Sequence, residues 1–274
     1  MLLVTGSNGQ LGSELKLLIN ENAIFTDVDT LDITDSNAVQ NFIREHRIDT
    51  IINCAAYTNV DKAEDEPDLA EKINVKGVEN LVKTGCKIIH ISTDYVFDGM
   101  NFKPYKETGE PNPISVYGKT KLAGEKVLME NADTCLILRT SWMYSHFAEN
   151  FVKTIARLSS EKSELRVVVD QVGTPTYAKD LAAAIIDIIP RIKIGSKEIY
   201  HYSNEGVCSW YDFACEIVDF IDSDCKIVPV TSAEYKTNAK RPHYSVLDKS
   251  KIKNDFNLNI RYWKEGLREC INGI

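Results

Sequence analysis

The feature that most constrains the fold of this chain is an apolar strand that runs directly into a glycine-rich turn. Leu2-Leu3-Val4-Thr5 is followed by Gly6-Ser7-Asn8-Gly9-Gln10-Leu11-Gly12 and then by an amphipathic stretch. Glycines three residues apart let the backbone turn tightly, approach a pyrophosphate and pack the helix against the strand. The helix amino terminus then offers unpaired N–H groups to phosphates. This strand–turn–helix unit predicts a dinucleotide-binding site at Gly6, Gly9 and Gly12.

The first half of the chain alternates short apolar runs with helical patterns. The expected strands are Leu2–Thr5, Ala23–Asp27, Thr50–Cys54, Lys87–Ser92 and Thr134–Arg139. The expected helices are Leu11–Ile19, Ser36–His46, Leu69–Lys83 and Tyr117–Met129. Strands that alternate with helices of this length favour right-handed βαβ units and a parallel sheet covered on both faces. We therefore predict an α/β fold with a doubly wound parallel sheet of the Rossmann type.

The pattern loosens after Trp142. We expect helices at Asn150–Leu158 and Lys179–Ile189 and strands at Leu165–Asp170, Glu198–Tyr202 and Cys225–Val230. Our prediction is a dinucleotide-binding core over residues 1–145. Residues 146–274 are predicted to form mainly a smaller α/β lobe for the substrate, with some segments returning to the core. Such a lobe would close over the carboxyl edge of the sheet, where open α/β sheets bind ligands.

Composition excludes several classes of function. The 274 residues carry a formal charge of −8, which argues against nucleic acid or an anionic membrane as the main partner. No run approaches 18 apolar residues, and the first residues lack the basic start of a signal peptide. The seven cysteines show no Cys-x-x-Cys pair and the five histidines are scattered, so we expect reduced thiols, a cytoplasmic protein and no metal site.

Two further features narrow the choice of cofactor. The glycine spacing G-x-x-G-x-x-G resembles that of short-chain dehydrogenases. Asp27 and Asp29 follow the turn at about the distance where a carboxylate binds the adenosine ribose. No arginine follows closely to accept a 2′-phosphate. The cofactor is therefore NADH or NADPH, with NADH favoured, and either aspartate is a candidate for the ribose.

Tyr117 and Lys121 lie four residues apart and so share one face of a predicted helix. A ketone that accepts hydride needs a proton, and a nearby ammonium lowers the pKa of a phenol so that it can exchange one. The pair follows the fourth strand and precedes the fifth, as in a short-chain reductase. The fourth strand ends in Ser92-Thr93-Asp94, and a hydroxyl there is expected to bind the substrate oxygen and tune the tyrosine.

With these residues in view, the sequence resembles the dTDP-4-dehydrorhamnose reductase family, extended short-chain dehydrogenases of deoxysugar biosynthesis. The likeness covers nearly the whole chain. The matching segments are Val4–Gly12, Leu31–Asp35, Asn53–Thr58, Val60–Glu64, Ser92–Phe97, Pro113, Tyr117–Lys121, Arg139–Trp142, Asn150–Val152, Asp170–Gln171, Pro175–Thr176 and Arg241–Pro242. The resemblance implies reduction of the 4-keto group of dTDP-6-deoxy-L-lyxo-4-hexulose to dTDP-L-rhamnose, a precursor of cell-surface polysaccharide.

The resemblance also implies residue roles. Tyr117 would be the proton donor, Lys121 would orient the cofactor ribose, and Thr93 would tune the tyrosine. The implied cofactor site comprises Gly6, Gly9, Gln10, Leu11, Gly12, Asp27, Asp32, Ile33, Ala56, Tyr57, Thr58, Tyr117 and Lys121. The implied substrate site comprises Thr93, Asp94, Tyr95, Trp142 and Asn150, with Trp142 against the nucleotide end.

The resemblance leaves some alternatives open. Some members dimerise through a carboxylate-bound metal; Glu14 fits one such position, but Lys179 stands where another carboxylate is expected, which argues against a bridged dimer. Monomer and homodimer both remain open. A sister 4,6-dehydratase would carry an acid where Tyr95 stands, and a 4-epimerase would keep NAD permanently bound. A related regulatory subunit of methionine adenosyltransferase binds nucleotide without sugar reduction as its known role.

Overall fold

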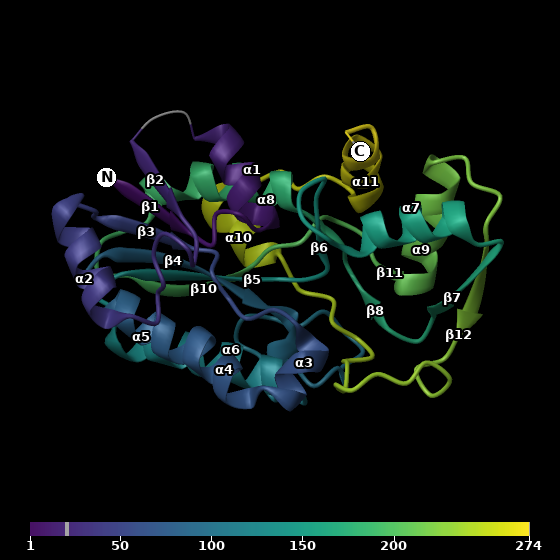
Figure 1. Cartoon of the computed structure of the whole chain (residues 1–274), viewed down its shortest axis with the longest axis horizontal. Helices are drawn as coiled ribbons and strands as arrows, with labels where there is room; N and C mark the ends of the chain where they lie inside the picture. The colour runs from purple at the N-terminus through teal and green to yellow at the C-terminus, as the bar shows by residue number, and fades with distance from the viewer. Residues whose placement is uncertain (20–21, 274) are drawn as a thin grey trace.

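A six-stranded parallel sheet organises the computed structural model, which describes residues 1–19 and 22–273 (Figure 1). Its strands are β1 (Leu2–Thr5), β2 (Ala23–Thr26), β3 (Thr50–Asn53), β4 (Lys87–Thr93), β5 (Cys135–Thr140) and β10 (Lys197–His201). Their order is β10-β5-β4-β3-β1-β2, and each neighbouring pair is parallel. The five strands predicted in the first half are all present, with ends shifted by one residue at most.

Helices cover both faces of this sheet, which confirms the predicted doubly wound fold (Figure 1). On one face lie α1 (Gln10–Leu18), α8 (Ala178–Ile188) and α10 (Ser250–Phe256); on the other lie α2 (Ser36–Glu45), α5 (Gly77–Val82) and α6 (Val116–Asn131). Successive strand residues feed opposite cores, because Val4 packs with the first set of helices and Leu3 with the second. Both residues are fully buried.

The strand order reverses between β1 and β3, so the chain leaves these two strands in opposite directions. A crevice opens at the carboxyl ends of parallel strands at such a reversal, and ligands of open α/β sheets bind there. Gly6 follows β1 and Cys54 follows β3 at this point. The fold therefore brings the glycine turn to the place where a dinucleotide is expected.

A second group of elements packs beside the sheet, around its own core of Phe213, Ile217 and Trp263. These elements are α7 (Phe151–Glu161), α9 (Trp210–Phe220), α11 (Trp263–Ile271), β7 (Glu164–Val168) and β12 (Lys226–Val230). Short pairs connect them to the sheet: β6 (Met143–Tyr144) with β9 (Thr176–Tyr177), and β8 (Val172–Gly173) with β11 (Cys208–Ser209). After residue 145 the chain also contributes α8, β10 and α10 to the sheet layer, and the division at that residue stays a prediction.

One predicted helix differs from its expected form. Instead of one regular α-helix at Leu69–Lys83, the chain forms α4 (Pro67–Glu71), a π-helical turn at Lys72–Lys76 and α5, which follow one another directly. A separate helix, α3 (Val60–Asp65), precedes them. Asn74 lies within the π turn, and its buried amide binds the backbone N–H and carbonyl of Tyr57 at 2.9 and 3.2 Å. It also donates to the Thr120 hydroxyl at 3.0 Å. The wider turn thus accommodates a polar side chain that ties this helix to the segment after β3.

Two 3-10 turns complete the described elements, at Asp94–Val96 and Ile189–Arg191. Within residues 1–19 and 22–273, none of the helices combines the length and the apolar character needed to cross a bilayer.

Candidate active site

A cleft of about 890 Å³ opens at the carboxyl edge of the sheet. Residues after β1 to β5 line it, together with α6 and the first residue of α9. The predicted site residues that line it are Gly6, Gly9, Gln10, Leu11, Gly12, Asp27, Asp32, Ile33, Ala56, Thr58, Thr93, Asp94, Tyr95, Tyr117, Lys121 and Trp142. Residues far apart in the sequence thus meet in one cleft, while Tyr57 and Asn150 are not among its lining residues.

The glycine turn lies at one end of the cleft. Gly6 has a φ of 65°, and a Cβ there would lie 2.6 Å from the Ala55 backbone nitrogen, so only glycine fits between β1 and β3. Gly9 caps α1 without a side-chain hydrogen bond, and a Cβ at Gly9 would meet only the Gly6 carbonyl, at 3.3 Å. The uncapped helix end therefore faces open cleft. Its geometry fits a diphosphate, which needs exposed N–H donors and no side chain in front of them.

Asp27 lies beside the turn at the end of β2. Its two carboxylate oxygens accept from the backbone N–H groups of Asn8 and Val28, at 2.9 and 2.8 Å. These bonds fix the carboxylate at the cleft edge, and Asp29 does not line the cleft. Asp32, which does, accepts from Thr34 N at 2.8 Å. No arginine is among the lining residues, so a carboxylate and not a guanidinium faces the expected ribose position.

Tyr117 enters the cleft from the first turn of α6. The Ser115 side chain caps this helix by accepting from Gly118 N at 3.1 Å. A Cβ on Gly118 would collide with the Tyr95 carbonyl, so the helix end sits directly against the segment after β4. Burial raises the pKa of Tyr117 to about 12, and nearby Asp94 adds to this, whereas a hydrogen bond with Thr93 opposes it. The expected lowering of this pKa is therefore wrong, because burial raises it by more than the hydrogen bond with Thr93 lowers it.

Lys121 lies one turn further along α6, with 2% of its surface exposed. Its ammonium donates to the Ile91 carbonyl at 2.6 Å and lies 3.2 Å from Nε2 of His90. Burial lowers the pKa of Lys121 to about 8, although the Glu125 carboxylate partly offsets this. Both contacts of the amino group are thus with β4, and none of the cleft carboxylates in the described part of the chain pairs with it.

The end of β4 forms the floor beside Tyr117. The Thr93 hydroxyl donates to the Asp94 carboxylate at 3.1 Å and accepts from Tyr95 N at 3.2 Å. Asp94 is 2% exposed, and burial raises its pKa to about 6, although the neighbouring Ser245 and Thr93 hydroxyls oppose this. Its Oδ2 accepts no hydrogen bond of good geometry from the described residues. The Tyr95 ring meets Tyr117 edge-on, with centroids 5.6 Å apart. A buried carboxylate oxygen without a partner is costly, so this atom is poised to accept from a ligand hydroxyl.

A buried ion pair supports the floor from behind. The Arg139 guanidinium binds the Glu125 carboxylate through Nη2 at 2.6 Å and Nε at 2.9 Å, and Ser92 donates to the same carboxylate at 2.5 Å. All three side chains are at most 3% exposed. Since Ser92 lines the cleft, this network links the floor to the α6 helix that carries Tyr117.

Two stacked indoles form another part of the cleft wall. Trp142 has a φ of 48°, and its ring lies on that of Trp210 with centroids 3.7 Å apart and an angle of 10° between the planes. Trp210 was not predicted as a site residue. It begins α9, far along the chain, and nothing in the local sequence marks it as facing Trp142. Lys72 and Glu149 are further charged lining residues that the sequence did not single out.

Known proteins are similar to this chain over nearly its whole length. The family model described as RmlD substrate binding domain matches residues 1–274. A dTDP-4-dehydrorhamnose reductase from Aggregatibacter actinomycetemcomitans is 40% identical over 284 residues, covering 97% of this chain and 97% of the relative. This chain belongs to the dTDP-4-dehydrorhamnose reductase family.

Solved structures of family members have the same fold. The dTDP-4-dehydrorhamnose reductase of Bacillus anthracis, crystallised in complex with NADP, has a TM-score of 0.95 at 39% identity and covers 100% of this chain and 99% of its own. The Clostridium acetobutylicum ortholog has a TM-score of 0.93 at 45% identity and covers 99% and 98%. A Streptomyces venezuelae dTDP-glucose 4,6-dehydratase, at 20% identity and a TM-score of 0.85, shows the shared fold alone.

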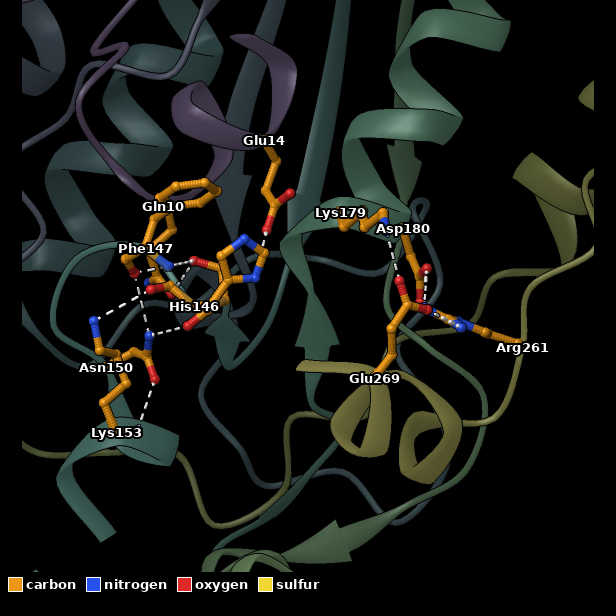
Figure 2. Close-up of polar contacts among 11 residues, drawn as sticks. Gln10, Glu14, His146, Phe147, Asn150, Lys153, Lys179, Asp180, Arg261 and Glu269 are labelled. Carbon is orange, nitrogen blue, oxygen red and sulfur yellow. Dashed lines mark hydrogen bonds and ion pairs between the residues drawn. The ribbon is translucent and has the colours of Figure 1, made fainter. Parts of the chain in front are cut away.

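Tyr57 and Asn150, which the family resemblance placed in the cofactor and substrate sites, make hydrogen bonds outside the cleft lining. The Tyr57 hydroxyl donates to Glu66 at 2.6 Å. Asn150 donates to the Ser145 carbonyl at 2.6 Å and caps α7 by accepting from Lys153 N at 3.2 Å (Figure 2). These hydrogen bonds hold the segment that contains residues 148 and 149, which line the cleft. Asn150 therefore affects the cleft indirectly, by fixing the backbone of this segment.

The two residues considered for a metal-bridged dimer, Glu14 and Lys179, lie on α1 and α8. Glu14 and His146 are side by side, with 3.8 Å between Oε1 and Nδ1, while Lys179 turns to Glu269 at 2.6 Å (Figure 2). Burial raises the pKa of Glu14 to about 7. Among the described residues, no three His, Cys, Asp or Glu side chains are grouped so that they could hold a metal ion. In this chain an ammonium pairs with the carboxylate of Glu269.

Proposed function

We propose that this protein reduces the 4-keto group of dTDP-6-deoxy-L-lyxo-4-hexulose with NADH or NADPH and releases dTDP-L-rhamnose. The observation that carries the proposal is the meeting of Tyr117, Thr93 and Lys121 in the same cleft as the glycine turn. A keto sugar bound in this cleft would have a proton donor, a hydroxyl group that can hydrogen-bond its oxygen and a cofactor site in the same cleft. Family members named for this activity cover the chain end to end.

Tyr117 is the proposed proton donor. Its raised pKa keeps the phenol protonated at neutral pH, so the group holds the proton that a developing alkoxide needs. Thr93, whose hydrogen bond favours the phenolate, would stabilise Tyr117 as the proton leaves. Lys121 would act by electrostatics and by holding the cofactor ribose. A bound nicotinamide supplies the hydride.

The rest of the cleft would hold the two ligands. Gly6, Gly9, Gln10, Leu11 and Gly12 would bind the cofactor diphosphate through the uncapped end of α1. The proposed adenosine and ribose contacts are Asp27, Asp32, Ile33, Ala56, Tyr57 and Thr58. The fixed carboxylate of Asp27 supports a preference for NADH, because it would accept from a ribose hydroxyl and repel a 2′-phosphate.

The proposed substrate contacts are Thr93, Asp94, Tyr95, Trp142 and Asn150. The unpartnered Oδ2 of Asp94 suits a sugar hydroxyl, and Trp142, backed by Trp210, offers an aromatic face to the base. Asn150 would act by ordering residues 148 and 149. Where a dehydratase needs a carboxylate base this chain has Tyr95, which supports reduction over dehydration. We place the enzyme in the cytoplasm, since its seven cysteines are free thiols, as a monomer or homodimer.

The experiment follows NADH and NADPH oxidation by the purified protein with dTDP-6-deoxy-L-lyxo-4-hexulose generated in situ. We expect rapid oxidation, with dTDP-L-rhamnose identified by NMR as the product. dTDP-glucose, which has no keto group, is the control and should give no oxidation. Absence of oxidation by a protein that still binds the cofactor would reject the proposed substrate, and turnover of a different keto sugar would redirect it.

A further inference from the structure

A chain of buried polar side chains runs from Lys121 into the middle of the sheet. Lys121 Nζ lies 3.2 Å from Nε2 of His90 on β4. Nδ1 of His90 lies 3.0 Å from the Asn53 carboxamide on β3, which in turn lies 2.7 Å from the Thr5 hydroxyl on β1. None of these three strand residues lines the cleft, and each is at most 1% exposed.

Polar residues at these positions need an explanation. The strands of a doubly covered parallel sheet are normally continuous apolar runs, as the neighbours Ile52 and Ile89 illustrate. A buried imidazole or carboxamide is costly unless it is hydrogen-bonded. The contacts described above give these buried groups hydrogen-bond partners. Of the four residues in the chain of contacts, Lys121 is the one that lines the cleft.

Two arrangements satisfy the same distances. If the Asn53 amide NH₂ donates to Nδ1 of His90, a neutral ring carries its hydrogen on Nε2, where it faces the hydrogens of the Lys121 ammonium. If the Asn53 carbonyl oxygen instead faces His90, Nδ1 carries the hydrogen and donates to it, and Nε2 accepts from Lys121. The Asn53 NH₂ then donates to the Thr5 hydroxyl. Only the second arrangement lets a charged Lys121 donate to Nε2 of His90, whereas the first sets two donors against each other. It requires the Thr5 hydroxyl to accept from Asn53 instead of donating to it.

We propose that neutral His90, with its hydrogen on Nδ1, is a positioning residue that accepts a hydrogen bond from Lys121 and, with the Ile91 carbonyl, fixes the direction of the ammonium. Two of the three ammonium hydrogens are then held by β4, and the third is free for the cofactor ribose. The inference rests on the proposed role of Lys121. Burial and the charge of Lys121 both hold the pKa of His90 well below its usual range, as a permanent acceptor requires.

The groups that face Lys121 set its charge state. Glu125 on α6 favours the ammonium, as does Cys54 after β3, whereas burial disfavours it. A ring nitrogen that accepts from the ammonium adds to the first effect. Replacing His90 by phenylalanine removes this acceptor while keeping an aromatic ring. The pKa of Lys121 should then fall, and the alkaline limb of the pH profile of kcat/KM should move to lower pH.

The direct test is ¹⁵N NMR of the histidine rings in the full protein at neutral pH without substrate, with the His90 signals identified by their loss in His90→Gln. We expect the hydrogen on Nδ1. A hydrogen on Nε2 would overturn the proposal. Because no turnover is involved, this result is independent of whether the proposed reaction is correct.

Two variants give the functional test. His90→Phe should lower kcat/KM for the keto sugar by about tenfold and shift the alkaline limb, because a bond to a charged donor is lost. His90→Gln is the matched control, since its side-chain carbonyl can replace Nε2 as the acceptor, and it should restore both. A His90→Phe enzyme with wild-type kcat/KM and pH profile would overturn the proposal. If His90→Phe does not fold, the NMR measurement and His90→Gln decide it.

Discussion

Glu14 is buried on α1 with no hydrogen bond from the described residues to its Oε1, from which His146 Nδ1 lies 3.8 Å away, and its ionisation should make the protein less stable as the pH rises. Burial is the main cause that raises its pKa from 4.5 to about 7; Glu269 and Asp180 add to this, and Lys179 opposes it. A carboxyl group with a raised folded-state pKa binds its proton more tightly in the folded protein. Its contribution is therefore fully present below pH 4.5 and is lost as the pH rises through about 7.

Glutamine at this position has a similar shape and no charge. Integrating the linkage relation between pH 5 and pH 8 gives a loss of roughly 2–3 kcal/mol for wild type that Glu14→Gln should not show. The free energy of unfolding is measured by urea denaturation at several pH values in that range. Glu110→Gln, which removes an exposed carboxylate, is the control and should follow wild type. A wild-type minus Glu14→Gln difference that stays constant with pH would refute the reasoning.

Two further predictions concern the site. Glu125→Ala leaves the buried Arg139 guanidinium without its carboxylate and should cost about 3–5 kcal/mol of unfolding free energy in urea, whereas an unchanged midpoint would contradict a buried pair. Asp27→Ala should raise the ratio of kcat/KM for NADPH over NADH by about tenfold or more, because it removes a fixed carboxylate beside the expected ribose. An unchanged ratio would show that Asp27 does not face the cofactor ribose.

The strands of the sheet could be predicted because strands buried on both faces are marked locally in the sequence by short apolar runs. The runs Leu2–Thr5 and Thr50–Cys54 have apolar centres, and the first ends at a glycine turn, so their type and approximate ends follow from the sequence. The strand β10 was also expected, but not its partner. Its parallel pairing with β5 depends on the path of some sixty intervening residues, which no local pattern encodes.

The residues of the candidate site could be predicted where they come directly at or after a predicted strand in the sequence. Tyr117, Lys121 and Thr93 are marked by their order relative to the fourth strand, and they do meet in the cleft. Trp210 was not predictable, since its stacking on Trp142 depends on how α9 packs. The sign of the pKa change at Tyr117 was also missed, because sequence spacing does not reveal the burial that raises it.

The central claim is that Tyr117 donates the proton to a keto sugar bound in the cleft, and Tyr117→Phe tests it most directly. The variant keeps the ring and removes only the hydroxyl. With dTDP-6-deoxy-L-lyxo-4-hexulose, its kcat should fall by about 10²–10⁴-fold, the usual contribution of a positioned acid. NADH affinity, measured by titration, should change little. Turnover equal to wild type would contradict the account.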